Sequence, residues 1–169
     1  MAPLIAIGIS ILALIVTVIN TLNTRRTSKI ALRQFMGKMT NFEIYLINSF
    51  SISIKKEKFL IFHITLTNKS DAKNSFQPTM ILEYIDTDDH ITQLQLPHVP
   101  EKSDKLSKGE FTFFSKQIFL NEKESTSKWL LFSYNESLLA NCRIDSYSIK
   151  LKDISGVSQT VRSTIIKEL

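Results

Sequence analysis

From Asn41 onward, short apolar segments recur at intervals of about 8 to 15 residues, separated by clusters of Asn, Ser, Asp, Lys and Pro. This rhythm is typical of antiparallel β-structure, because each apolar segment is long enough for one strand and each polar cluster supplies a turn. About 130 residues are enough for one β-sandwich with its own core and too few for two ordinary domains. Residues 41–169 are therefore expected to form a mainly β fold, an antiparallel β-sandwich of about seven to eight strands. The candidate strands are residues 42–54, 59–67, 79–85, 91–96, 110–120, 128–134, 144–151 and 158–166.

Alternation is clearest in the second of these segments. One of its faces carries four apolar side chains, Leu60, Phe62, Ile64 and Leu66. The residues between them mix apolar and polar side chains, so one face of this strand is expected to pack and the other to be partly solvated. In the fifth segment the apolar parity shifts between Phe113 and Phe114, which predicts a β-bulge. Trp129 is expected in the sandwich core, the usual place for a large aromatic side chain; the alternative is an aromatic face for stacking or peptide binding.

The segment from Phe62 to Ser70 reads Phe-His-Ile-Thr-Leu-Thr-Asn-Lys-Ser. It resembles an early strand and its exit turn in immunoglobulin-like sandwiches of membrane-anchored or exported bacterial proteins, most of them uncharacterised. The resemblance implies an immunoglobulin-like fold and a general interaction role, and it transfers no functional residue. An antibody-type domain is not expected, because the chain has a single cysteine, Cys142, whereas antibody domains bridge their sheets with a cysteine pair.

The other strong feature is an apolar run from Ala2 to Leu22, whose few polar members are uncharged. Roughly 21 helical residues span about 31 Å, which matches the ~30 Å hydrocarbon core of a bilayer. The run therefore predicts a single transmembrane α-helix over residues 1–23. A cleaved signal peptide and a buried helix of a soluble protein are the alternatives.

Five basic residues and no acidic residue follow this run: Arg25, Arg26, Lys29, Arg33 and Lys38. Residues 24–40 are expected to form a basic helical stalk whose lysines and arginines contact the membrane surface. Lys and Arg beside a membrane span usually stay in the cytoplasm, so the N-terminus is expected outside the cell membrane and the β-domain in the cytoplasm. The whole chain has 21 basic and 16 acidic residues, and without these five the two kinds balance. Such a balance argues against binding to nucleic acid.

Small or weakly polar side chains recur in the apolar run at alternating four- and three-residue steps. They are Ala6, Ser10, Ala13, Thr17 and Asn20. This spacing places them along one side of a helix, where small residues allow two helices to approach closely within lipid. The lipid bilayer is thus one expected partner, and the seam predicts either self-association or an unidentified protein partner. The alternative is a plain anchor.

Three carboxylates and an imidazole are concentrated between two predicted strands, at Asp86, Asp88, Asp89 and His90. These side chains could bind a hard cation such as calcium. The alternative is a simple turn, because Asp side chains accept hydrogen bonds from nearby backbone and the segment lacks the glycine and distal glutamate of a calcium loop. The three histidines have no zinc-site spacing, and no catalytic or phosphate-loop motif occurs, so neither an enzyme nor a cofactor is expected.

A polar segment from Pro97 to Gly109 is longer than a hairpin requires. Long loops on a rigid sandwich often bind partners, and in a cytoplasmic domain Lys102, Lys105 and Lys108 could face acidic lipid or a protein partner, although Glu101 and Asp104 weaken that field. The alternative is a solvated connector. Together these features predict a single-pass membrane protein whose β-sandwich is a non-enzymatic protein-binding or scaffold module, engaging its partner by a strand edge or a loop. The alternative function is a ligand or metal-ion sensor domain on a membrane anchor.

Overall fold

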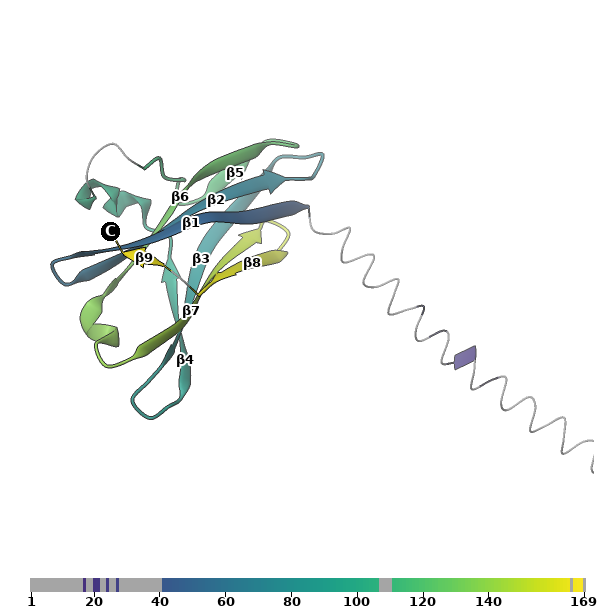
Figure 1. Cartoon of the computed structure of the whole chain (residues 1–169). Helices are drawn as coiled ribbons and strands as arrows, with labels where there is room; N and C mark the ends of the chain where they lie inside the picture. The colour runs from purple at the N-terminus through teal and green to yellow at the C-terminus, as the bar shows by residue number, and fades with distance from the viewer. Residues whose placement is uncertain are drawn as a thin grey trace, which may run out of the picture. The chain divides into compact units, whose positions relative to one another are not determined.

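The computed structural model describes residues 41–106, 111–164 and 166–168, and five single positions before them, Thr17, Asn20, Thr21, Thr24 and Thr27. The β-structure lies within one compact unit, Thr40–Leu169. The chain is mainly β, and its strands form two sheets (Figure 1). The elements are β1 (Phe42–Ile54), β2 (Glu57–Asn68), β3 (Asn74–Ile85), β4 (Ile91–Pro97), η1 (Pro100–Lys105), β5 (Ile118–Leu120), β6 (Ser125–Asn135), η2 (Glu136–Leu139), β7 (Arg143–Asp153), β8 (Ser158–Ser163) and β9 (Lys167–Glu168), where η marks a short 3-10 helix.

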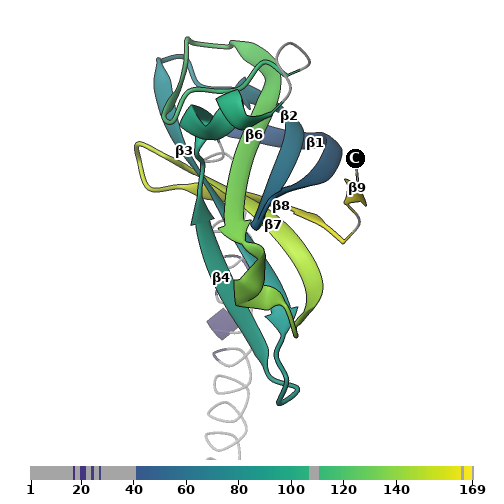
Figure 2. The same ribbon diagram turned by 90° about the vertical axis from the view of Figure 1, so that its left-hand side faces the viewer.

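The first sheet has the order β6-β2-β1-β9 and the second the order β4-β3-β7-β8, with β5 also paired to β3. Paired strands are antiparallel except β1 and β9, which are parallel. In Figure 1, β1, β2 and β6 lie side by side in one layer, and β3, β7 and β8 lie in the other. Figure 2 views the molecule from the left-hand side of Figure 1 and brings β6 to the front, with β2 and β1 beside it. The two sheets therefore pack face to face.

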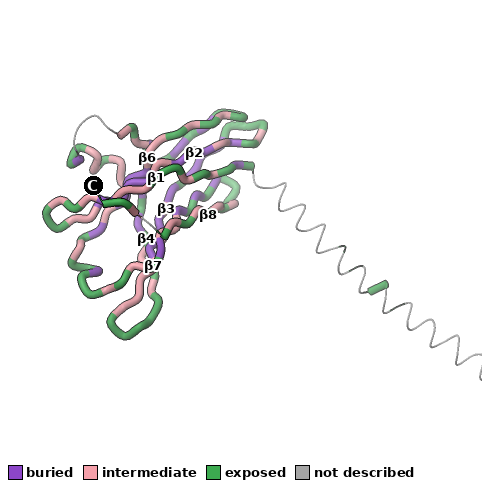
Figure 3. Tube along the Cα trace, in the orientation of Figure 1, coloured by how far each residue is buried: buried purple, intermediate pink, exposed green. Residues whose placement is uncertain are grey.

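The main core lies between these sheets. Four side chains on the inner face of β2 are fully buried, Leu60, Phe62, Ile64 and Leu66. Phe62 joins the two layers, since its ring centroid lies 6.0 Å from that of Phe132 on β6 and 6.4 Å from that of Tyr147 on β7. Figure 3 shows buried residues following the strands of both sheets. The packed face predicted for β2 is confirmed.

The outer face of β2 is covered over part of its length. Phe59 and Ile61 are fully buried there, in a second apolar cluster with Leu106 and Leu131. The cover comes from the segment that follows β4, because η1 contacts β6 and Leu106 packs into this cluster. The outer side chains from His63 onward are half-buried. The partly solvated face predicted for β2 is therefore confirmed only toward its C-terminal end.

The segment predicted as a polar loop, Pro97 to Gly109, forms this cover as far as Leu106. His98 and Leu106 are both buried, and η1 lies between them. Lys108 and Gly109 lie outside the described residues. The described part is therefore a solvated connector only along η1, which has no buried residue, because His98 before it and Leu106 after it are buried in the fold.

The fifth predicted strand, residues 110–120, is a strand only at its end, in β5. Phe113 instead forms an isolated parallel bridge with Trp129, and the Phe114 amide donates to the Trp129 carbonyl at 2.9 Å. Phe113 packs against the second cluster, whereas Phe114 is buried in the main core. The β-bulge predicted here is wrong, because the parity shift marks the point where the chain crosses from the outer face into the core. Register shifts of the sheets lie elsewhere, at Leu46/Asn48 and Glu83/Tyr84.

The structure corrects the prediction of a single-pass membrane anchor over residues 1–23. Among the residues that it describes, no helix is long and apolar enough to cross a membrane. The five helical positions described before the sandwich are polar and exposed. Two of their hydroxyls bond to the preceding turn: Thr21 Oγ1 donates to the Thr17 carbonyl and Thr24 Oγ1 to the Asn20 carbonyl, both at 2.8 Å.

The other residues singled out in the predicted anchor and stalk lie outside the described part of the chain. They are Ala6, Ser10 and Ala13 of the seam and the basic residues Arg25, Arg26, Lys29, Arg33 and Lys38. The predicted stalk over residues 24–40, the orientation, the cytoplasmic location and the contact with lipid stay predictions.

Candidate functional site

A pocket of about 750 Å³ opens on the first sheet where β1 turns into β2. We call it the basic pocket, because four of its lining side chains are lysines, Lys55, Lys56, Lys102 and Lys105. Half-buried Ile54 supplies its accessible apolar wall with the buried Phe59 behind it, and among the described residues that line it Glu57 is the one carboxylate. Tyr134 also borders the pocket, although its side chain packs in the main core. Burial raises the pKa of Tyr134 to about 12, so the phenol is neutral at ordinary pH. The pocket thus combines an excess of positive charge with an uncharged apolar wall.

The first two lysines occupy the turn of the β1–β2 hairpin. Ile54 pairs with Glu57 across the strands, which leaves Lys55 and Lys56 as the connecting residues. Lys55 adopts φ 60°, the left-handed conformation that such tight turns require. Both side chains are exposed. The turn therefore presents two adjacent positive charges at one side of the pocket.

The other two lysines converge on Glu57 from the opposite side. Lys102 Nζ donates to Glu57 Oε1, and Lys105 Nζ donates to Oε2 at 2.7 Å. Ser133 Oγ also donates to Oε1, at 3.0 Å. These interactions, led by the hydrogen bond from Lys102 and then that from Lys105, lower the pKa of Glu57 to about 2 against a smaller opposing effect of burial. Three elements, β2, η1 and β6, therefore meet around one ionised carboxylate.

A buried histidine holds η1 beside this pocket. His98 lies just before η1, and its Nδ1 accepts the Leu131 amide at 3.0 Å. Nε2 must then carry the proton, and it donates to the Phe114 carbonyl at 3.0 Å. The next amide, that of Val99, donates to the Leu131 carbonyl at 2.9 Å. Burial lowers the pKa of His98, so the imidazole is neutral in this arrangement.

The described lining of the basic pocket carries more positive than negative charge. Lys102 and Lys105 share the single carboxylate of Glu57. Among the ion pairs of the described residues, none involves Lys55 or Lys56. An acidic group attached to an apolar body matches this lining, because the ammonium groups attract its charge and the apolar wall packs against the rest.

Two of the four lysines that line this pocket were singled out from the sequence. Lys102 and Lys105 were expected to face an acidic partner, whereas Lys55, Lys56 and Glu57 carried no prediction. The available signal was the pair of lysines between two predicted strands. Nothing in the sequence indicated that they would lie near lysines about 45 positions further along, since that proximity depends on η1 folding back over β2.

The predicted cation site forms the β3–β4 turn. Ligand atoms of Asp86, Asp88 and His90 lie within 4.8 Å of one another, and Asp89 is not part of this group. Asp86 Oδ1 accepts the amides of Asp88 and His90, both at 2.9 Å. The bond from His90 is the main cause that lowers the pKa of Asp86. The carboxylate of Asp86 is thus used by the backbone of its own turn, as the turn interpretation expects.

The remaining chemistry-bearing residues lie in separate settings. His63 stacks on Trp129, with centroids 4.5 Å apart and an interplanar angle of 17°. This places Trp129 half-buried on the outer face beside the second cluster, and not between the sheets as predicted. Cys142 is half-buried and packs against the main core. Neither arrangement brings a nucleophile against a base.

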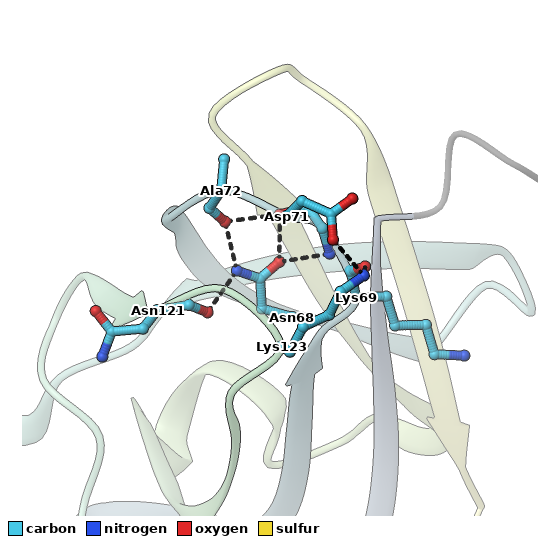
Figure 4. A network of polar contacts seen from close by, with 7 residues as sticks. Asn68, Lys69, Asp71, Ala72, Asn121 and Lys123 are labelled. Atoms are coloured by element: carbon cyan, nitrogen blue, oxygen red, sulfur yellow. Dashed lines mark hydrogen bonds and ion pairs between the residues drawn. The ribbon is translucent and has the colours of Figure 1, made fainter.

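A polar network at the far end of β2 is structural (Figure 4). Asn68 is fully buried, and its Nδ2 donates to the carbonyls of Ala72 at 2.9 Å and Asn121 at 2.7 Å. Its Oδ1 accepts the Ser70 hydroxyl at 2.7 Å. Lys123 adds an exposed ion pair with Asp71 at 2.8 Å. The Asn68 side chain forms these hydrogen bonds within the chain. The network therefore holds the β2–β3 turn against the β5–β6 turn.

No protein-family model matches the chain, and no match is found among curated proteins. Among solved structures it is similar to the FixG-related protein from Vibrio parahaemolyticus, at 10% identity over 76% of this chain and 98% of that chain, with a TM-score of 0.43. The putative ApaA protein from Bordetella pertussis matches at 8% identity over 72% of this chain and 86% of that chain, with a TM-score of 0.32.

The chain is also similar to the alkylpurine DNA glycosylase AlkC of Pseudomonas fluorescens, at 7% identity and a TM-score of 0.43. That match covers 76% of this chain and 30% of the glycosylase. These likenesses are too distant and too varied to assign a function. They do not indicate an immunoglobulin-like membrane-anchored family, and that resemblance stays a prediction.

Proposed function

We propose that this chain is a non-enzymatic protein-binding module that captures an acidic segment of its partner in the basic pocket. The observation that carries the proposal is the charge of that pocket. Four lysines line it with one carboxylate, and Glu57 already engages two of them. Lys55 and Lys56 are left to bind an acidic group from outside the chain.

The surroundings of the pocket favour a protein partner. Phe59 and Ile54 line the pocket and also belong to, or pack against, the second apolar cluster. The same cluster continues on the outer face to half-buried Phe111, Phe113 and Trp129. Protein interfaces commonly combine such apolar, aromatic surface with charged groups at the rim. A partner segment could therefore place its acidic residue in the pocket and its apolar residues along this face.

The test is binding of the full-length chain to a fluorescent hexaglutamate peptide, with a hexaglutamine peptide as the uncharged control. We expect hexaglutamate to bind and hexaglutamine not to bind. Affinity should fall as salt rises from about 50 to about 500 mM, because mobile ions screen exposed charges. Fluorescence anisotropy measures both effects.

The double variant Lys55→Glu/Lys56→Glu should weaken hexaglutamate binding at least roughly tenfold, since it replaces two attractive charges by two repulsive ones. Lys116→Glu/Lys150→Glu is the matched control, because it makes the same charge change at two exposed lysines outside the pocket lining. Equal loss in both variants, or no loss in the first, would show that the basic pocket is not the binding site.

A further inference from the structure

We infer that the acidic group selected by the basic pocket is a doubly charged phosphate, so that the partner segment is phosphorylated. This inference rests on the proposed function and names the chemistry of the ligand at the same site. It follows from how the pocket already holds an anion, from which cations line it, and from the space that it leaves.

The contacts of Glu57 show how the pocket surrounds a negatively charged group. Its carboxylate receives two ammonium groups, from Lys102 and Lys105, and one hydroxyl, from Ser133. The chain therefore fills one anion position itself. Lys55 and Lys56, which form no ion pair among the described residues, offer a second position at the hairpin turn. The pocket of about 750 Å³ has room for a residue larger than a carboxylate side chain.

The cations among the described residues of the lining are all lysines. Arginine presents a planar fork that matches a carboxylate with two parallel hydrogen bonds, whereas a lysine ammonium is a compact point charge without that geometric preference. A site built from lysines alone therefore selects its ligand mainly by total charge. A phosphate monoester carries about −1.5 to −2 charges at pH 7 and three strong acceptor oxygens, against a single charge on a carboxylate. The phosphate is the better match for Lys55 and Lys56 together.

The apolar wall favours a phosphorylated protein segment over a phosphorylated lipid headgroup. Half-buried Ile54 lines the same pocket as the lysines and packs against the second cluster, from which half-buried Phe113 and Trp129 continue the apolar wall along the outer face. An apolar residue next to a phosphoserine could pack against this wall while the phosphate reaches the hairpin turn. The acyl chains attached to a lipid headgroup stay in the hydrocarbon core of the bilayer, so a phosphorylated headgroup brings no apolar side chain to this wall.

The experiment uses three fluorescent peptides that differ only at the central position, which is serine, phosphoserine or glutamate, with phenylalanine next to it and glycine around both. Binding to the full-length chain is measured by anisotropy at pH 7.5 and pH 5.5. At pH 7.5 we expect the phosphoserine peptide to bind at least about tenfold more tightly than the glutamate peptide, and the serine peptide to bind least. The Lys55→Glu/Lys56→Glu variant should lose that preference, and the Lys116→Glu/Lys150→Glu control should keep it.

The pH dependence separates charge selection from other effects. The second ionisation of a phosphate monoester has a pKa near 6, so lowering the pH to 5.5 should weaken binding of the phosphoserine peptide severalfold. The glutamate peptide keeps its charge over this range, and so does Glu57, whose pKa is about 2. Any change in the pocket itself, such as protonation of His98, would weaken both peptides alike and is thereby distinguished.

Equal affinity for the phosphoserine and glutamate peptides would overturn the phosphate inference and leave the proposed function standing. Failure of hexaglutamate to bind at all, while the phosphoserine peptide binds, would restrict the proposed function to phosphorylated partners and support the inference. Failure of every acidic peptide would overturn both. Tighter binding to phosphatidylcholine vesicles containing phosphatidic acid than to the phosphoserine peptide would overturn the assignment to a protein segment.

Discussion

His98 is a buried residue whose hydrogen bonds join three segments of the fold. Only 2% of it is exposed, and its two ring nitrogens bond to the Leu131 amide and the Phe114 carbonyl. One neutral imidazole thus joins β6, the segment before β5 and the start of η1. Protonation would remove the bond from the Leu131 amide, because Nδ1 would then carry a hydrogen and could only donate, to the Leu131 carbonyl at 3.0 Å.

We expect His98 to make the free energy of unfolding depend on pH in mildly acidic solution. The pKa of this imidazole is about 6.5 when unfolded and is lowered by burial in the folded chain, although the hydrogen bonds with the backbone of Phe114 and Leu131, and then the charge of Glu101, oppose part of the shift. Between those two values the unfolded chain binds a proton that the folded chain does not. Stability should therefore fall as the pH decreases below 6.5, by about 1.4 kcal/mol for each pKa unit of lowering, until the folded pKa is passed.

Urea unfolding of the protein and of His98→Gln at pH 7.5 and pH 5.0 measures this contribution. The variant should be less stable at pH 7.5, because a shorter amide cannot satisfy both partners, and should lose less stability on acidification. Other titrating groups are common to both proteins and cancel in the comparison. An identical pH response of the two proteins would show that His98 is not the group responsible.

At the scale of elements, β2 carries both apolar clusters. Its inner face faces the main core, and Ile61 on its outer face is as fully buried as Ile64 on its inner face. A two-sided burial of this kind is normal for a strand covered on both faces, and here η1 and Leu106 provide the outer cover.

Ile61→Ala and Ile64→Ala are therefore expected to destabilise the fold by similar amounts, about 2 to 4 kcal/mol each, since both leave a cavity among buried side chains. Ile91→Ala serves as control, because Ile91 is 74% exposed and its truncation should change stability by less than about 0.5 kcal/mol. Urea denaturation gives all three values. A cost for Ile61→Ala close to that of Ile91→Ala would mean that η1 does not cover β2 in solution.

Most strands were predictable because alternation along a strand is a local property. The first has the predicted bounds, Phe42–Ile54, and β4 extends the prediction by one residue. The strand predicted over residues 110–120 is wrong for most of its length. Its phenylalanines resemble a strand in the sequence, but they cross between two apolar clusters, and that path depends on η1 and β6. Periodicity cannot distinguish a strand from an extended segment that changes layers.

At the scale of the whole molecule, the two clusters share one strand and should unfold together. Phe62 links the sheets in the main core, and Phe59, three positions earlier, belongs to the second cluster. Disruption of either cluster therefore exposes one face of β2 and weakens the packing of the same strand in the other cluster. Unfolding of the sandwich is expected to be a single cooperative transition, as is usual for domains of this size.

Trp129 allows a direct test, because it is the single tryptophan of the chain and packs against the second cluster. Its fluorescence reports that cluster, whereas far-ultraviolet circular dichroism reports the sheets as a whole. We expect the two signals to give the same urea midpoint. A fluorescence transition at clearly lower urea would show that η1 and the second cluster open separately from the main core.

The sequence by itself determined the mainly β character, most strand positions and the inner face of β2, because side-chain alternation is encoded within a few neighbouring residues. It also suggested a membrane span over residues 1–23, which the described part of the structure corrects. Only the tertiary structure decided the basic pocket, where Glu57 meets Lys102 and Lys105 across three elements. Hydrogen bonds and ion pairs between distant residues depend on strand pairing and on the path of the connections. Local periodicity in the sequence predicts neither the pairing nor the path.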